Sequence, residues 1–263
     1  IAYVGKIFGP LESIGMEIQS IQSAMAGIQH IGEFLDEPER EPVSASPLPE
    51  ELRQKAVAFS HVTFGYDPAR PILRDFSCSL EPGEQAILMG PSGCGKSTLF
   101  KLLLGMYSPW QGNVALLGHR AGTIPEGEKR SLYGCVEQEF SAVPGTVEDQ
   151  VTLGDGSVTP EQVDRALALV GLKETVDRMP QGKETPMGDG LFSQGELQLL
   201  NIARAVAREP RLLLLDEITA NLDSQTEARV LEALERAARG RTVLSISHRF
   251  SRMMAGQRIV RMG

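Results

Sequence analysis

Hydrophobic positions along the chain follow two different patterns, which divide it into an N-terminal helix and a longer mixed region. Between residues 11 and 35, apolar side chains recur every three or four positions with polar residues between them, as in an amphipathic helix. These apolar residues are Leu11, Ile14, Ile18, Ile21, Met25, Ile28 and Phe34. From residue 56, short apolar runs alternate with amphipathic stretches, which is typical of a parallel sheet covered by helices. We therefore expect an α/β fold over residues 56–263.

Individual elements can be predicted within the mixed region. Strands are expected at Gln85–Met89, Arg211–Leu215 and Thr242–Ile246, and helices at Lys96–Leu104, Pro160–Val170, Gly195–Arg208 and Glu227–Arg239. The helix from Pro160 has the clearest ends. Thr159 and Gln162 have the spacing of a capping box, Pro160 stands at the first helical position, and Gly171 can close the C-terminus.

The segment between the two regions is predicted to be a linker. It mixes acidic residues with prolines, which remove backbone donors and restrict φ. These residues are Asp36, Glu37, Pro38, Glu39, Glu41, Pro42, Pro47 and Pro49. The expected division is therefore a helix over residues 1–37, a linker over 38–55 and a folded domain over 56–263.

Composition narrows the classes of function. The 263 residues are 41% apolar, enough for a buried core. A net charge of -8 disfavours a broad nucleic-acid surface, so no nucleic-acid partner is expected. Cys78, Cys94 and Cys135 form no CxxC pair, which argues against a disulfide framework or a zinc cluster and favours a reducing compartment. The sequence also has no run of about twenty apolar residues that could span a bilayer.

A glycine-rich segment between a predicted strand and a predicted helix matches the phosphate-binding pattern GxxxxGK[ST]. It consists of Gly90, Pro91, Ser92, Gly93, Cys94, Gly95, Lys96, Ser97 and Thr98. Glycines let backbone N–H groups curl around phosphate oxygens at the positive end of a helix. Lys96 is expected to contact the β- and γ-phosphates, and the Ser97 hydroxyl to hold Mg²⁺. The alternative, a chance glycine-rich turn, fits less well because both flanking elements are those that the motif requires.

An acid pair follows a second apolar strand. Four leucines precede Asp216 and Glu217, so the carboxylates are expected at the carboxyl end of a buried strand, where open α/β sheets bind ligands. Asp216 would organise the metal, and Glu217 would orient or deprotonate the attacking water. Two solvated acids after a buried strand are common in isolation, but the phosphate-binding loop favours the functional interpretation.

The order of these motifs over residues 56 to about 260 resembles the ATP-binding cassette family. Tyr66 resembles the aromatic residue that stacks on adenine, and Gln138 the glutamine that senses Mg²⁺ and the transport domain. Asp223, in Ala220–Asp223, resembles the loop that couples paired sites, and His248 resembles the switch histidine that contacts the γ-phosphate. Each residue alone would ordinarily be a packing or surface residue, so these roles follow from the resemblance.

Residues 192–196 take the place of the family signature LSGGQ. They are Phe192, Ser193, Gln194, Gly195 and Glu196, of which Ser193 and Gly195 agree with the pattern. The segment stands before a helix whose N-terminus can face phosphate. The departures put the strength of the contact with ATP on a second chain in doubt, and Glu196 would add a negative charge near a triphosphate if it pointed inward.

The resemblance implies a P-loop NTPase core with a mostly parallel sheet, an antiparallel β subdomain and a helical signature subdomain at about 140–208. It implies ATP and Mg²⁺ as ligands and a second nucleotide-binding domain as partner, identical or not. Gly145–Val147 and Val151–Asp155 resemble the exporter-type segment that contacts coupling helices. Residues 1–37 resemble the end of a transmembrane-domain helix.

The implied function is ATP hydrolysis that drives export at the cytoplasmic face of a cell membrane. The transmembrane domain is expected to be fused upstream, and the full-length sequence is expected to contain about six hydrophobic spans there. Two alternatives stay open: a soluble ABC ATPase that does not transport, and a non-hydrolysing ATP-dependent dimerisation switch. Glu217 and His248 speak against the switch.

Overall fold

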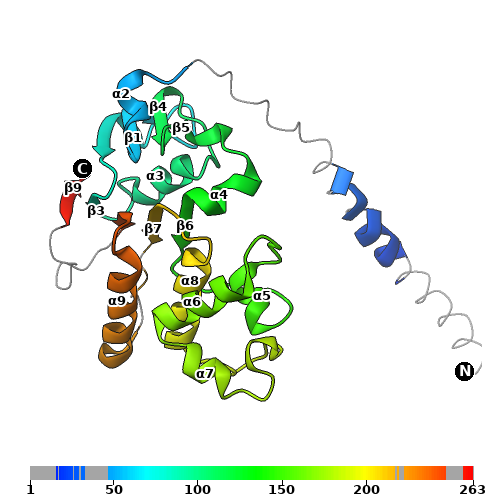
Figure 1. Ribbon diagram of the computed structural model, residues 1–263. Coiled ribbons are helices and arrows are strands. Elements are labelled where there is room, and N and C mark those ends of the chain that lie inside the picture. The colour runs from blue at the N-terminus through cyan, green and yellow to red at the C-terminus, as the bar shows by residue number, and fades with distance from the viewer. Residues whose placement is uncertain are drawn as a thin grey trace, which may run out of the picture. The chain divides into compact units, whose positions relative to one another are not determined.

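The computed structural model describes residues 16, 18–25, 27–29, 31–32, 47–216, 218, 222–246 and 257–262. The chain forms two units, residues 1–44 and 45–263. Every described residue of the first unit is helical, in agreement with the predicted amphipathic helix (Figure 1). Its apolar side chains, among them Ile18, Ile21 and Ile28, are exposed. Leu11, Ile14 and Phe34 lie outside the described residues.

A parallel sheet forms the centre of the second unit. In the described chain it has five strands in the order β6-β7-β8-β3-β9. Their bounds are β3 (Gln85–Met89), β6 (Tyr133–Val136), β7 (Leu212–Asp216), β8 (Thr242–Ile246) and β9 (Arg258–Arg261). β7 begins one residue later than predicted and includes Asp216. All five strands run the same way, so the segments after β3, β6, β7 and β8 start from one edge of the sheet.

A smaller antiparallel sheet lies beside the parallel one (Figure 1). Its strands, in the order β2-β1-β4-β5, are β1 (Val57–Phe64), β2 (Leu73–Leu80), β4 (Gln111–Leu116) and β5 (His119–Arg120). One hydrophobic cluster contains residues of both sheets and of the helix between them, for example Leu88, Leu99 and Leu116. The packing therefore holds the helix that follows the phosphate-binding loop between the two sheets, which confirms the predicted α/β fold.

Helices cover the rest of the second unit. They are α2 (Glu50–Arg53), α3 (Lys96–Leu103), α4 (Glu126–Leu132), α5 (Val147–Thr152), α6 (Pro160–Val170), α7 (Lys173–Asp177), α8 (Gln194–Val206) and α9 (Ser224–Ala238), with 3-10 turns at Ala121–Thr123 and Gly182–Glu184. α5 to α8 fall within the segment predicted to be a helical subdomain. The predicted domain limits at 37/38 and 55/56 stay predictions. None of the described helices is long and apolar enough to cross a membrane.

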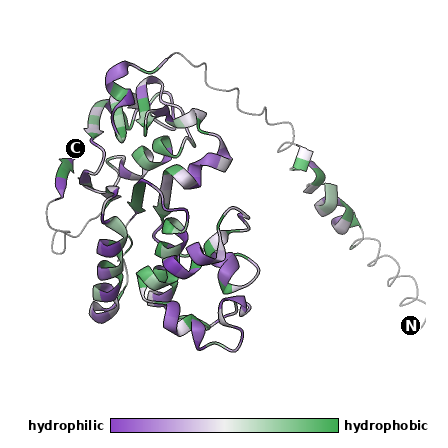
Figure 2. Cartoon of the chain, viewed as in Figure 1, coloured by the Kyte–Doolittle hydropathy of each residue, from purple (hydrophilic) through white to green (hydrophobic). Residues whose placement is uncertain are grey.

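The predicted helix bounds agree best with the structure where the sequence shows clear capping residues. α6 has the predicted bounds, with both halves of the Thr159–Gln162 capping box and Gly171 in the left-handed conformation at φ 78°. α9 begins three residues before its predicted start, because Asp223 accepts hydrogen bonds from the N–H groups of Gln225 and Thr226. Figure 2 shows the contrast between the mostly apolar residues of β7 and the mixed apolar and polar residues of α9.

Candidate nucleotide-binding site

The phosphate-binding loop, residues 90–98, comprises the connection between β3 and α3 and the first turn of α3. Gly93 and Gly95 have φ angles of 82° and 102°, a backbone conformation that residues with a Cβ rarely adopt. A Cβ on Gly90 would lie 2.5 Å from the carbonyl oxygen of Met262. The loop therefore needs glycine at these positions for its curvature and for its close approach to Met262, the residue after β9.

Lys96 lies inside the curve of this loop. Its side chain is buried, and its Nζ donates hydrogen bonds to the carbonyl oxygens of Gly90 (2.9 Å) and Pro91 (3.1 Å). Both acceptors are neutral, so an anionic phosphate oxygen would be a stronger partner for the ammonium group. The lysine is therefore held in the loop with a charge that a phosphate can use.

A pocket of about 390 Å³ opens over the loop. Its lining residues are Tyr66, Ile72, Ser92, Gly93, Gly95, Lys96, Ser97 and Thr98. Gly90, Pro91 and Cys94 belong to the predicted site but are not among these lining residues. A larger cavity of about 570 Å³ lies at the opposite edge of the parallel sheet, where Arg211 precedes β7 and Thr242 begins β8. Its lining contains none of the predicted site residues.

Tyr66 forms one wall of the pocket and is half exposed. Its hydroxyl group lies 3.4 Å from the Thr98 Oγ1 atom, and its ring meets Phe64 and Tyr107 edge-on at centroid distances of 5.4 and 5.3 Å. The Lys101 ammonium lies 5.4 Å from the ring centroid. An aromatic ring supported from the side in this way can offer a face to a purine base.

Asp216 and Gln138, two of the predicted metal residues, lie at or just after the ends of strands that end at the same sheet edge as the phosphate-binding loop. Asp216 is half-buried at the end of β7, and Gln138 is exposed two residues after β6 ends. In the described part of the chain, neither Asp216 nor Gln138 lines the 390 Å³ pocket. Glu217 and His248 lie outside the described residues, so their roles stay predictions.

The oxygen donors at this edge suit Mg²⁺. Magnesium usually binds one or two protein oxygens together with substrate phosphates and waters. Ser97 lines the pocket, and Asp216 is the last residue of β7, at the same edge of the sheet. The residues present therefore fit a magnesium ion that is held mainly by a bound triphosphate.

The signature segment, residues 192–196, forms the N-terminus of α8. Ser193 is the N-cap, and its N–H and hydroxyl groups donate to the Glu196 carboxylate at 2.9 and 2.8 Å, while the Glu196 N–H donates to the Ser193 hydroxyl. The carboxylate is thus turned back on its own helix N-terminus, where the helix dipole favours a negative charge. Phe192 is buried in the helical core, and Gln194 is exposed.

Gly195 lies where α8 approaches α9. A Cβ at this position would be 2.2 Å from the Thr226 Cγ2 atom. Asp223, the N-cap of α9, lies three residues before Thr226, and hydrogen bonds from the Thr226 side chain and backbone hold the pKa of its carboxyl group below the usual value. Gly195 and Asp223, both predicted site residues, therefore have a structural role where α8 meets α9, independent of any contact with a ligand.

Three polar residues of α8 were missed by sequence reasoning. Gln198 and Asn201 are buried, and Arg204 is half-buried, in a helix whose other inward residues are apolar. Their side chains donate to backbone carbonyl groups between residues 137 and 150. The signal in the sequence is the spacing of three, which places polar residues on one face of a helix.

Comparisons with known proteins give a consistent result. A family model described as ABC transporter matches residues 73–220, more than half of the chain. The multidrug resistance ABC transporter ATP-binding and permease protein of Lactococcus lactis is 34% identical over 260 residues, which cover 98% of this chain and 44% of that protein. The fatty acid ABC transporter ATP-binding/permease protein of Mycobacterium tuberculosis is 34% identical over 253 residues, 95% of this chain and 40% of that protein.

A solved structure is also similar. The structure of a bacterial Atm1-family ABC exporter with ATP bound aligns with a TM-score of 0.75 at 30% identity, over 99% of this chain and 46% of that one. The chain therefore spans less than half the length of each of these relatives.

Proposed function

The chain belongs to the ABC transporter family, and on that premise we propose that it is a motor domain that binds and hydrolyses ATP to drive export across a membrane. The observation that carries the proposal is the pocket over the phosphate-binding loop. It combines a lysine, a hydroxyl group and loop glycines with the ring of Tyr66. A nucleoside triphosphate needs both kinds of surface, one for its phosphates and one for its base.

In this proposal different residues contact the base, the phosphates and the metal ion of the bound nucleotide. Tyr66 stacks on adenine, while Lys96 exchanges its carbonyl partners for the β- and γ-phosphates. Ser97 and Asp216 hold Mg²⁺, whose charge, when it is bound, offsets that of the phosphates. Glu217 orients or deprotonates the attacking water, Gln138 contacts the metal, and His248 contacts the γ-phosphate.

Export is supported by the names of the relatives. Two of them are described as ATP-binding and permease proteins, and the solved structure is described as an exporter. We propose that this chain likewise works with a transmembrane domain, fused upstream, at the cytoplasmic face of a cell membrane. Residues 1–37 are then the end of a transmembrane-domain helix.

A second nucleotide-binding domain is the other proposed partner. At the N-terminus of α8, Ser193 is exposed and Gly195 is buried, and neither residue lines the described pocket of the same chain. Free N–H groups at a helix N-terminus suit a phosphate. We propose that Ser193 and Gly195 close over the γ-phosphate bound to the partner domain.

Titration with a fluorescent ATP analogue tests the location of the nucleotide. Lys96→Ala should weaken binding strongly, because it removes the charge that faces the phosphates. Tyr66→Ala should weaken binding by about 1–3 kcal/mol, the range for stacking of a base on an aromatic ring. Tyr66→Phe is the matched control and should bind as the unchanged chain does. Equal affinity for all four proteins would show that nucleotide does not use this pocket.

A further inference from the structure

The polar stripe of α8 consists of Gln198, Asn201 and Arg204. The spacing of three residues places the side chains on one face of the helix, toward the glutamine segment, residues 137–141. Gln198 and Asn201 are 8% and 4% exposed. Their amide groups are thus removed from water, so the hydrogen bonds they make inside the protein have few competitors.

Each member of the stripe donates to the backbone of a segment distant in sequence. Gln198 Nε2 donates to the Gln138 carbonyl oxygen at 2.6 Å, and Asn201 Nδ2 donates to the Glu137 carbonyl oxygen at 3.0 Å. The Gln138 side chain itself is exposed. The stripe therefore fixes the main chain at Gln138 and leaves the functional amide facing outward.

Arg204 extends this hold to the far end of the glutamine segment. Its Nη1 and Nε atoms donate to the carbonyl oxygens of Ser141 (3.0 Å) and Gln150 (2.7 Å), and the guanidinium lies 4.3 Å from the centroid of the Phe140 ring. Burial lowers the pKa of Arg204 to about 10, so the side chain is still charged at neutral pH. These are charge-assisted hydrogen bonds, which are stronger than neutral ones.

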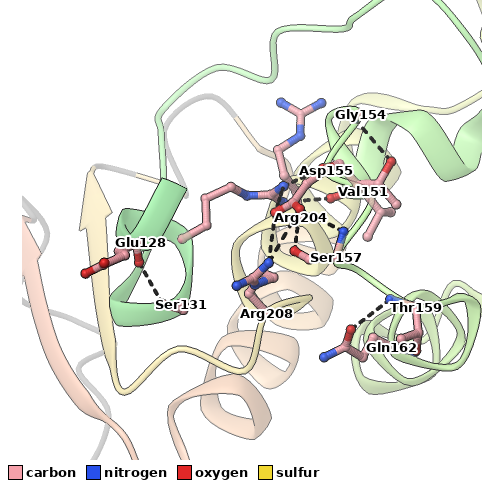
Figure 3. A network of polar contacts seen from close by, with 12 residues as sticks. Glu128, Ser131, Val151, Gly154, Asp155, Ser157, Thr159, Gln162, Arg204 and Arg208 are labelled. Atoms are coloured by element: carbon pink, nitrogen blue, oxygen red, sulfur yellow. Dashed lines mark hydrogen bonds and ion pairs between the residues drawn. The ribbon is translucent and has the colours of Figure 1, made fainter. Parts of the chain in front are cut away.

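A neighbouring network ties α8 to the segment after α5 by a different route. Arg208, two residues beyond the end of α8, pairs with Asp155 at 3.2 Å (Figure 3). Arg130 of α4 pairs with the same carboxylate at 3.4 Å. Among the described residues, Arg208 has no hydrogen bond or ion pair with the glutamine segment, so it offers a control for general loosening of this end of the helix.

We propose that Gln198, Asn201 and Arg204 are positioning residues that hold Gln138 in place for the magnesium–nucleotide complex. The proposal rests on the function proposed above and adds a connection to it. α8 begins at the signature segment and holds the glutamine segment through its middle. α8 therefore connects two parts of the proposed mechanism. Its N-terminus, the signature segment, is proposed to contact the ATP of the partner domain, and its middle holds Gln138, which is proposed to contact the metal in this chain's own site.

The test is the affinity for a fluorescent ATP analogue, measured with Mg²⁺ and in EDTA. Gln198→Met keeps the size of the side chain and removes its donor. It should leave the affinity in EDTA within about twofold of the unchanged chain, and reduce the gain from Mg²⁺ by about three- to tenfold, as expected for the loss of one hydrogen bond. The Mg²⁺ concentration that gives half-maximal ATP hydrolysis should rise and kcat should fall.

Arg208→Met is the control and should keep the full gain from Mg²⁺, even if its melting temperature falls. Asn201→Leu tests the same claim through a second donor if Gln198→Met does not fold. An undiminished gain in the stripe variants, or an equal loss in Arg208→Met, overturns the positioning role. If the unchanged chain shows no dependence on Mg²⁺, the proposed function fails as well, so the two failures can be told apart.

Discussion

At the scale of single residues, Gly195 shows how a motif position can have a steric requirement in addition to a proposed role toward a ligand. Replacing a helical glycine by alanine usually stabilises a helix by about 0.5–1 kcal/mol. Here the new methyl group would be 2.2 Å from the Thr226 Cγ2 atom, so α8 and α9 would have to separate. The steric term should therefore outweigh the gain in helix propensity.

We predict that Gly195→Ala lowers the free energy of unfolding by about 1–3 kcal/mol, the usual cost of overpacking. Thr226→Ser removes the opposing methyl group and keeps the hydroxyl. In that background, Gly195→Ala should be neutral or stabilising. Urea unfolding of the four proteins measures the coupling, and a Gly195→Ala cost that is the same in both backgrounds would contradict the steric account.

At the scale of elements, the ends of helices depend on local residues, and the sequence predicts them when those residues are recognised. α6 has the predicted ends because Thr159, Pro160, Gln162 and Gly171 each act through a nearby backbone group. Ser193 and Glu196 have the same S-x-x-E spacing of a capping box. The resemblance to the family signature does not reveal this cap, in which the Glu196 carboxylate turns back to the Ser193 N–H and hydroxyl groups.

Contacts between segments that are distant in the sequence could not be predicted from the sequence alone. The side chains of the polar stripe of α8 donate to backbone carbonyl groups about 54 to 64 positions away in the sequence. Every residue has a backbone carbonyl group, so the residue types at these positions do not indicate which carbonyl groups act as acceptors. The antiparallel sheet was expected only from the resemblance, because β2 reads Leu-Arg-Asp-Phe-Ser-Cys-Ser-Leu and does not alternate cleanly. The phosphate-binding loop was predictable because all its residues are contiguous.

The cap of α9 makes a prediction about pH. Hydrogen bonds from Thr226 hold the pKa of the Asp223 carboxyl group below its usual value of about 3.9. The folded state thus binds this proton less readily than the unfolded state. The stabilisation should be complete above that usual value and should be lost as the pH falls through the lower pKa of the folded protein.

Asp223→Asn isolates this effect, because asparagine also caps helices but does not titrate. The difference in free energy of unfolding between the two proteins should be constant from pH 7 to about pH 5 and should shrink at lower pH. Urea unfolding across this range provides the measurement. A difference that stays constant down to pH 3 would mean that the charge of Asp223 adds nothing to the cap.

At the scale of the whole molecule, the proposed site needs two chains, with Lys96, Gln138 and Glu217 from one and Ser193 and Gly195 from the other. We expect Lys96→Ala and Ser193→Arg to be inactive alone, the arginine because its bulk and charge block the interface. In a mixed homodimer, one site takes both defects and the other takes neither. Mixing the two variants should therefore restore part of the ATPase rate, more so at higher protein concentration.

The control for this mixing experiment is pairing with the unmutated chain. Each variant must still dimerise with it, which light scattering can show. Mixtures that stay inactive under that condition would contradict a shared site in a homodimer. They would favour a site within one chain or a partner that differs from this chain.

The most direct test of the central claim, hydrolysis of ATP at this site, is steady-state phosphate release from the unchanged chain and from Glu217→Gln. The amide keeps the shape of the side chain and cannot accept the proton of the attacking water. Release should fall by about a hundredfold or more, the usual contribution of a general base, while ATP binding stays intact. Equal release from the two proteins, with ATP bound equally well, would contradict the account.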